Sequence, residues 1–184
     1  DPHGGKELMH IPCAGFPYGI AVLTAGPRKD AIAYVGGERD GVVDVVDLKA
    51  GKVRKAIRVG ASPVQLLLNR AQTRLYVANS ASDTVSVIDT KTDKVIDTIL
   101  LRPTDLSGLP GAGPLGLALS PDEKRLYVTL SDMNSVGVVD LRKRSLIGMF
   151  PTGWLPTSVL ATKSGLLLAR AKGVKTQHPN NKPV

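Results

Sequence analysis

The chain has 184 residues, of which 42% are hydrophobic and 22% are charged, proportions that are ordinary for a globular fold. No apolar run approaches the roughly 20 residues that a membrane-spanning helix needs. The 24 basic and 16 acidic residues give a net charge of +8, but the basic residues are scattered and aromatic residues make up only 4% of the chain, so the composition does not favour nucleic-acid binding.

A pattern of short β-rich runs occurs three times along the chain. Tyr-Val pairs begin at residues 34, 76 and 127, and an aspartate closes the matching run at residues 47, 89 and 140. Both series have steps of 42 and 51 residues. Within each repeat, alternating runs separated by turn-forming residues predict four antiparallel strands. Self-similarity of this length, built from short β-rich runs, is typical of the blades of a β-propeller.

The repeats divide the chain into an expected order of elements. We expect an all-β fold in which residues 5–12 form the last strand of a preceding blade, residues 14–58, 61–100 and 112–151 form full blades, residues 154–170 form the first half of a further blade, and residues 171–184 form a loop or tail. This order gives roughly fifteen strands in four-stranded antiparallel blades.

The expected set of blades is incomplete. A closed propeller has about four to eight complete blades, because only closure protects the edges of the sheets. The sequence therefore predicts a segment of a longer polypeptide, with a parent of about seven blades. A short chain that closes its ring by self-association is the alternative.

The second repeat resembles a known family of repeats. Leu75-Tyr76-Val77-Ala78-Asn79, followed by Val85-Ser86-Val87-Ile88-Asp89, is similar to the YVTN-type β-propeller repeat of bacterial and archaeal exported and surface-layer proteins. The resemblance covers residues 5 to 170, although Thr129 replaces the alanine of the motif in the third repeat and Gly36-Gly37 replaces Ala-Asn in the first. It implies a propeller in an exported protein and leaves the function open.

The C-terminal end has a second, narrower resemblance. Pro151-Thr152-Gly153-Trp154-Leu155-Pro156-Thr157, with Ala171-Lys172-Gly173 and His178-Pro179-Asn180 after it, is similar to a segment of bacterial proteins that join a YVTN propeller to a phosphoesterase domain of the alkaline-phosphatase superfamily. The match is partial, because Leu155 and Arg170 replace the tyrosine and asparagine of that segment. It carries no catalytic residue, since the metal-binding residues of that superfamily would lie further along the parent polypeptide.

Candidate catalytic and cofactor residues are few. His10 and Cys13 have a spacing that a metal could use, but one pair is weak evidence, and a strand-end histidine beside a buried cysteine is the better interpretation. Asp89 and Asp140 recur at one position of the repeat, which indicates hairpin turns that they cap with their carboxylates. We therefore predict no catalytic residue, no metal site and no cofactor. Cys13 is the only cysteine, which excludes a disulfide within the chain.

A binding surface is expected where the loops of a propeller gather. The connections between the second and third strands and those between blades emerge on one face, and loops on a rigid scaffold are where function concentrates. The candidate residues of this face are Glu38, Arg39, Asp40, Asn79, Ser80, Asp83, Arg102, Asp105, Ser131, Asp132, Asn134, Trp154, Lys172 and His178. The segment 102–111 accounts for the longer 51-residue step, and a tolerated surface insertion explains it equally well.

Two functions follow from these observations. The first is a noncatalytic binding or scaffold module of an exported bacterial protein, periplasmic, cell-surface or secreted, whose partner is a protein, a glycan or a surface ligand in addition to the rest of its own polypeptide. The second is the propeller part of a bifunctional phosphoesterase whose metal-dependent domain lies outside this chain. A redox-cofactor propeller is disfavoured because the sequence has no Cys-x-x-Cys-His motif.

Overall fold

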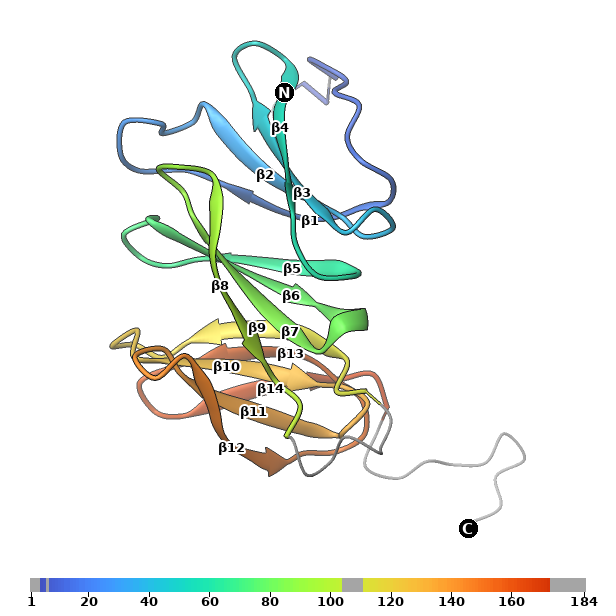
Figure 1. Ribbon diagram of the computed structural model, residues 1–184, viewed down its shortest axis with the longest axis vertical. Coiled ribbons are helices and arrows are strands. Elements are labelled where there is room, and N and C mark those ends of the chain that lie inside the picture. The colour runs from blue at the N-terminus through green and yellow to red at the C-terminus, as the bar shows by residue number, and fades with distance from the viewer. Residues whose placement is uncertain (1–3, 6, 104–110, 173–184) are drawn as a thin grey trace, which may run out of the picture.

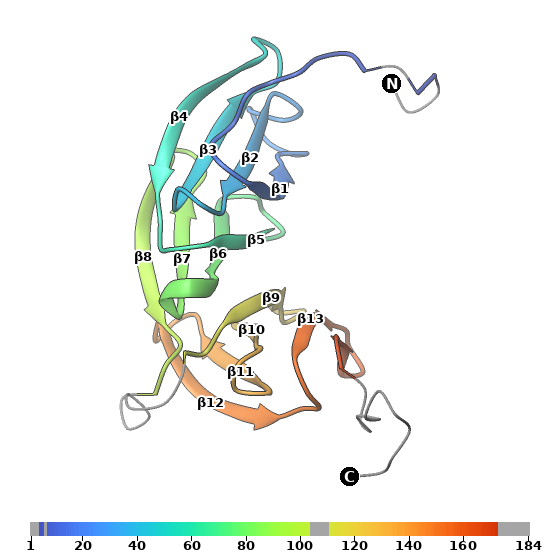
Figure 2. The ribbon, with the colours of Figure 1, turned by 90° about the vertical axis from the view of Figure 1, so that its right-hand side faces the viewer.

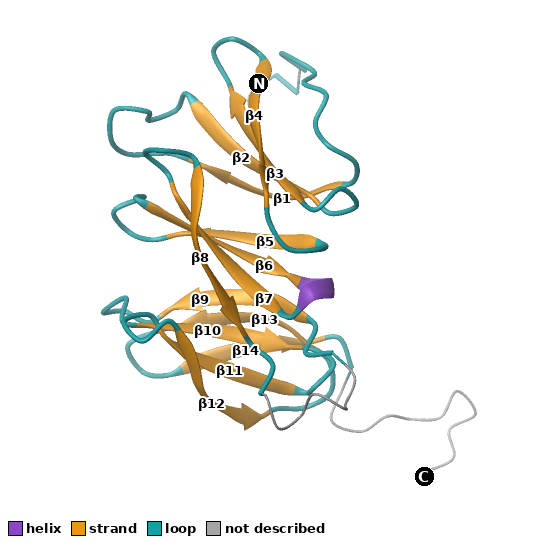
Figure 3. Cartoon of the chain, in the orientation of Figure 1, coloured by secondary structure: helices purple, strands orange, loops and turns teal. Residues whose placement is uncertain are grey.

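The fold was described from a computed structural model, which places residues 4–5, 7–103 and 111–172. These residues form antiparallel sheets stacked side by side along a curved path (Figures 1 and 2). The one helical element among them is a single 3-10 turn, Ser80–Ser82 (Figure 3). The predicted all-β architecture of four-stranded antiparallel blades is confirmed.

Three sheets have four strands and one has two. The first blade contains β1 (Pro17–Val22), β2 (Ile32–Gly37), β3 (Val42–Asp47) and β4 (Lys52–Arg58). The second contains β5 (Pro63–Leu68), β6 (Arg74–Asn79), β7 (Thr84–Asp89) and β8 (Lys94–Leu100). The third contains β9 (Pro114–Leu119), β10 (Arg125–Leu130), β11 (Ser135–Asp140) and β12 (Ser145–Pro151), and the half-blade contains β13 (Pro156–Ala161) and β14 (Leu166–Arg170). Each full blade has its strands in chain order, so hairpins alone connect them.

The repeated tyrosines occupy the same place in each blade. Tyr34 pairs with Val45, Tyr76 with Val87, and Tyr127 with Val138, always between the second and third strands. Tyr34 and Tyr76 are buried and Tyr127 is half-buried. The two buried tyrosines belong to the hydrophobic clusters that lie between blades.

The hydrophobic core lies between neighbouring blades. One cluster joins the first and second blades through residues such as Tyr34, Val45 and Leu75. Another joins the second and third blades and is centred on residues such as Val85 and Leu126. Alternation along the strands places apolar side chains on both faces of the blades, so each blade depends on its neighbours for burial.

The start of the chain differs from the expected strand. Residues 7–16 contain no strand, whereas the repeat predicts the last strand of a preceding blade at 5–12. Such a strand pairs with the third strand of its own blade, and no described residue supplies that third strand. The segment instead lies on the first blade: the sulfur of Met9 lies against Gly51, and the backbone N–H of Ala14 donates to the buried Asp44 carboxylate at 2.7 Å.

The recurring aspartates cap the hairpins between third and fourth strands, as predicted. The Oδ1 atom of Asp47 accepts the N–H groups of the residues two and three positions on, and Asp89 and Asp140 do the same, with donor–acceptor distances of 2.8–3.0 Å. These N–H groups favour the ionised carboxylate and lower the pKa of all three aspartates.

This capping leads to a prediction about acid stability for Asp140, whose lowered pKa comes first from the N–H of Lys143 and then from that of Arg142. A carboxylate with a folded-state pKa below its unfolded value contributes stability that is present above the unfolded pKa and lost as pH falls through the folded one. Asp140→Asn keeps an acceptor oxygen and removes the titration. We expect the wild type to be the more stable protein at neutral pH and to lose this advantage below about pH 4. Urea midpoints of both proteins across this range test the prediction, and a difference that does not vary with pH would contradict it.

Candidate ligand-binding face

The loops expected to bind a partner do gather at one side of the sheets. Turns 38–41, 80–83 and 131–134 join second to third strands, and the connectors that lead into β5, β9 and β13 run beside them, on the right in Figure 1. We refer to this side as the loop-bearing face. Rigid strands on either side hold each of its turns, which is the usual setting for a binding surface.

A backbone contact repeats between each connector and the turn beside it. The N–H of Glu38 donates to the carbonyl of Phe16 at 2.9 Å, that of Ser80 to Ser62 at 2.9 Å, and that of Ser131 to Gly113 at 3.0 Å. The three acceptor residues precede the prolines that open β1, β5 and β9, and all have φ between 51° and 58°. Glycine adopts this left-handed conformation most easily, so Phe16 and Ser62 occupy it at a cost in backbone energy.

Polar side chains fix the turns at two further points. Asp83 and Asn134, each the last residue of its turn, also have positive φ values, which these residue types tolerate. The Oδ1 of Asp83 accepts the N–H groups of Ala112 at 2.7 Å and Gly113 at 3.2 Å, and the Oδ1 of Asn134 accepts that of Leu155 at 2.8 Å. These two candidate residues therefore hold the entry of the following blade.

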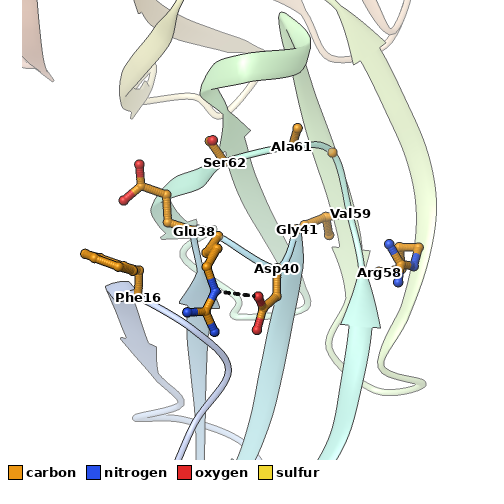
Figure 4. Close-up of a pocket in the computed structure, with 10 residues that line it drawn as sticks. Phe16, Glu38, Asp40, Gly41, Arg58, Val59, Ala61 and Ser62 are labelled. Carbon is orange, nitrogen blue, oxygen red and sulfur yellow. Dashed lines mark hydrogen bonds and ion pairs between the residues drawn. The ribbon is translucent and has the colours of Figure 1, made fainter.

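One pocket of about 470 Å³ opens on this face between the first and second blades (Figure 4). Its volume lies within the usual range for small-molecule sites. The lining residues come from the turn after β2, the connector between β4 and β5, and the residue before β1: Phe16, Glu38, Arg39, Asp40, Gly41, Arg58, Val59, Gly60, Ala61 and Ser62.

Arg39 and Asp40 form an ordered pair in this pocket. The Nε of Arg39 donates to Oδ1 of Asp40 at 3.0 Å, and the N–H of Gly15 donates to Oδ2 of Asp40 at 2.7 Å. These contacts lower the pKa of Asp40, the Gly15 N–H having the larger effect. The guanidinium lies against Gly15, where a Cβ atom would come within 2.1 Å of its nitrogen. Glycine at this position therefore lets the guanidinium lie in its present place.

Three other side chains of the pocket are available to contact a ligand. Glu38 is half-buried, and its carboxylate makes no hydrogen bond or ion pair with any described residue. The Phe16 ring is 70% exposed, and Figure 4 shows it at the same end of the pocket as Glu38. The Ser62 hydroxyl likewise has no partner within the described part of the chain, and it lies across the pocket from Asp40 (Figure 4).

The structure divides the other candidate residues into buried and accessible ones. Asn79 and Ser131 are buried, and their side chains donate internally: the Asn79 amide to Thr84 and Ser86, and the Ser131 hydroxyl to the carbonyl of Pro156. Their side chains are therefore not available at the surface. Period-two alternation alone could not separate them from their exposed neighbours, because Asn79 ends a strand and Ser131 directly follows one.

The remaining candidate residues that the structure describes lie at several places outside the pocket. Ser80 contributes its backbone to the contact described above, and Asp132 is exposed. The Nη1 atom of Arg102 lies 3.8 Å from Oδ2 of Asp83. The Nζ of Lys172 lies 5.7 Å from the ring centre of Trp154, within the range of a cation–π contact. Asp105 and His178 fall outside the described residues.

Sequence reasoning missed Phe16, Arg58 and Ser62. Phe16 and Ser62 directly precede prolines that open the first strand of a blade, which we call its inner strand. Arg58 ends the fourth strand of its blade, which we call the outer strand. The signal that could have found the first two is the proline itself, because it marks the connector that reaches the loop-bearing face. Arg58 has no comparable signal.

Metal ligands do not cluster in the described part of the chain: no group of three or more His, Cys, Asp or Glu side chains could hold an ion there. We expected a histidine at the end of a strand beside a buried cysteine. In the structure His10 is exposed and Cys13 is only half-buried. The difference follows from the missing strand at 5–12. Burial, and then the charge of Asp44, raise the pKa of the Cys13 thiol. None of the described residues forms a helix of the length and hydropathy needed to cross a bilayer.

Comparison with known proteins supports the fold. No family model matches the chain. It is 28% identical over 157 residues to the seven-bladed beta-propeller protein Rv1057 of Mycobacterium tuberculosis, an alignment that covers 83% of this chain and 37% of that protein. It is 32% identical over 130 residues to an uncharacterised protein of Salmonella typhimurium called YncE, covering 71% of this chain and 33% of that protein. The chain thus spans about a third of the length of these relatives.

Two solved structures are similar in shape. The hydrazine synthase of Kuenenia stuttgartiensis superposes with a TM-score of 0.71 and 23% identity, over 92% of this chain and 46% of that one. A streptogramin B lyase superposes with a TM-score of 0.66 and 13% identity, over 85% and 49% of the two chains. Identities this low establish the fold alone. The chain is a β-propeller, and its described sheets are an incomplete set of blades.

Proposed function

We propose that this propeller is a noncatalytic binding module that holds its ligand or partner on the loop-bearing face. The observation that carries the proposal is the 470 Å³ pocket between the first two blades, with the exposed Phe16 ring and a Glu38 carboxylate that no described residue pairs with. A concave site with a few convergent polar groups on a rigid scaffold is the usual form of a ligand site.

The roles of the aspartates favour binding over catalysis. A general acid or base needs a pKa near the working pH and access to the reacting atom. Asp40, Asp47, Asp89 and Asp140 have lowered pKa values instead, because each accepts backbone N–H groups that hold a loop in place. Asp40 thereby fixes part of the loop-bearing face, whereas Asp47, Asp89 and Asp140 fix the hairpins between third and fourth strands, which do not belong to that face.

The wider setting belongs to the same proposal. The resemblance to YVTN repeats supports an exported bacterial protein, located in the periplasm, at the cell surface or in the medium, with a protein, glycan or surface ligand as partner. The relatives are longer than this chain, so the remainder of its own polypeptide is a further partner within the proposal. The scattered basic residues argue against a nucleic-acid partner.

A fragment-binding measurement tests the proposal. Neutral, cationic and anionic fragments are screened by ligand-observed NMR against the wild type and the double variant Glu38→Ala/Arg39→Ala. We expect fragment binding that the double variant loses. The matched control is Asp122→Ala/Lys124→Ala, which removes an exposed charged pair from the turn between β9 and β10, outside this pocket. Binding that survives the pocket variant would contradict the proposal.

A turnover assay separates this module from a phosphoesterase. The purified chain is incubated with p-nitrophenyl phosphate and divalent metal ions, beside its full-length parent. We expect no turnover by the chain itself. Turnover by the chain that is lost in His10→Ala would overturn the noncatalytic role, and turnover by the parent alone would identify the chain as the propeller portion of a bifunctional phosphoesterase.

A further inference from the structure

The charges of the pocket on the loop-bearing face balance one another. Its lining contains two carboxylates, Glu38 and Asp40, and two guanidinium groups, Arg39 and Arg58, so the formal charge of the lining is zero. An anionic ligand such as phosphate would meet the two carboxylates, and a cationic ligand would meet the two guanidinium groups. The arrangement therefore favours a ligand without net charge.

The unused hydrogen-bonding groups are of both kinds. Glu38 offers acceptor oxygens that no described residue uses. Arg39 uses its Nε atom for Asp40, and no described residue accepts from its two terminal nitrogens. Ser62 can donate or accept. Vicinal hydroxyl groups of a ligand match such a set, because each hydroxyl both donates and accepts, and bonds to charged groups are the stronger kind.

The aromatic ring supplies the apolar part of the site. Phe16 is 70% exposed and has φ of 56°, a conformation that is costly for a bulky residue. The equivalent residues before β5, β9 and β13 are Ser62, Gly113 and Leu155, so Phe16 is the one aromatic residue among the four. The Phe16 and Glu38 backbones are hydrogen-bonded, so ring and carboxylate project from adjacent positions. A flat ligand with one apolar face can cover the ring while its hydroxyls reach the charged groups.

From these three observations we propose that the pocket binds a neutral saccharide. The C–H face of a pyranose ring would pack on Phe16, and its hydroxyl groups would donate to Glu38 and accept from Arg39. This inference rests on the proposed binding function and adds the class of ligand. Several of the lining side chains are exposed, which favours weak binding, with a dissociation constant on the order of 1 mM for a disaccharide.

Three neutral disaccharides serve as probes: maltose, cellobiose and N,N′-diacetylchitobiose. Each is tested separately by saturation-transfer difference NMR and by titration against the whole chain. We expect at least one to bind, and Phe16→Ala and Glu38→Gln each to weaken it by about fivefold or more. Leu167→Ala is the matched control, because Leu167 is another large apolar residue, 63% exposed, outside the pocket and outside the candidate face, and its removal should leave binding unchanged.

Each other outcome overturns the inference. No binding by any of the three disaccharides up to about 10 mM excludes the class at a useful affinity. Binding that Phe16→Ala leaves intact places the sugar elsewhere. Inorganic phosphate or tetramethylammonium binding at Glu38 and Arg39, without the sugars, would show a charged ligand. That last result would leave the proposed binding function standing. In the fragment screen, binding that is lost in Asp122→Ala/Lys124→Ala but kept in Glu38→Ala/Arg39→Ala would contradict both the proposed function and this inference.

Discussion

Gly19→Ala is expected to lower the free energy of unfolding by about 2–3 kcal/mol. Gly19 lies in the inner strand β1, where a Cβ atom would approach the backbone carbonyl oxygen of Val64 in the next blade to 2.2 Å. A backbone atom cannot move aside as a flexible side chain can, so the inner strands of the first two blades would have to separate. Gly116 has the same role between the third blade and the half-blade, where a Cβ atom would lie 2.8 Å from Cα of Ser158.

Gly148→Ala provides the matched control for this prediction. Gly148 lies in the outer strand β12, and a Cβ atom there would have no neighbour within 4 Å. Alanine should therefore be tolerated, or should stabilise by a few tenths of a kcal/mol through the lower entropy of the unfolded chain. Urea unfolding of the two variants measures both effects. Equal midpoints for Gly19→Ala and Gly148→Ala would show that the inner strands are not closely held.

The repeat made the blades predictable because burial between blades imposes the same pattern on every copy. The tyrosines at 34, 76 and 127 share a register, and Asp89 and Asp140 cap the turns that their recurrence indicates. Each strand of the pattern also needs a partner strand. The segment 5–12 has the sequence of a fourth strand, but no described residues form a third strand with which it could pair, so the expected strand is not seen there.

The candidate site was less predictable because it depends on positions within the repeat that vary. Glu38, Arg39 and Asp40 were found from the turn that contains them, and the structure places all three in one pocket. Asn79 and Ser131 were placed on the face by the same reasoning, yet their side chains bond inward. Whether a turn residue points out or in depends on the neighbouring connector, and that contact between distant segments is not visible in a single sequence.

A polar cluster joins the first two blades on the side away from the loop-bearing face. Among the described residues, the contact between the second and third blades contains no cluster of this kind. Arg28 makes two bonds to the carboxylate of Asp93, at 2.9 and 3.0 Å, and the Tyr34 hydroxyl donates to the same carboxylate at 2.7 Å. The ion pair is mostly shielded, with side-chain exposures of 24% and 15%. At the equivalent turn position of the third blade stands Arg144, whose contact with Asp97 is 3.6 Å long and largely exposed.

Asp93→Ala is therefore expected to destabilise the fold by about 2–3 kcal/mol, because it leaves a shielded guanidinium and a buried hydroxyl with the Thr90 carbonyl as their remaining shared acceptor. Alanine also tolerates the φ of 53° at this position less well than aspartate does. Asp93→Asn keeps one acceptor oxygen and should cost about 1 kcal/mol. Arg144→Ala is the matched control at the same turn position and should change stability by less than about 0.5 kcal/mol. A loss no larger for Asp93→Ala than for Arg144→Ala would show that the cluster does not hold the blades together.

The alkaline limb of the same measurement separates the hydroxyl from the ion pair. Burial, and then the bond to Asp93, raise the pKa of Tyr34 well above its usual value. Since the raised pKa belongs to the folded state, the stability that it represents is complete below the unfolded value near 10 and is lost as pH rises above it. The wild type should therefore lose stability more steeply than Tyr34→Phe above about pH 10, although Tyr34→Phe is the less stable protein at neutral pH. Parallel curves for the two proteins would mean that the Tyr34 hydroxyl ionises as freely in the folded chain as in the unfolded one, which its bond to the Asp93 carboxylate should prevent.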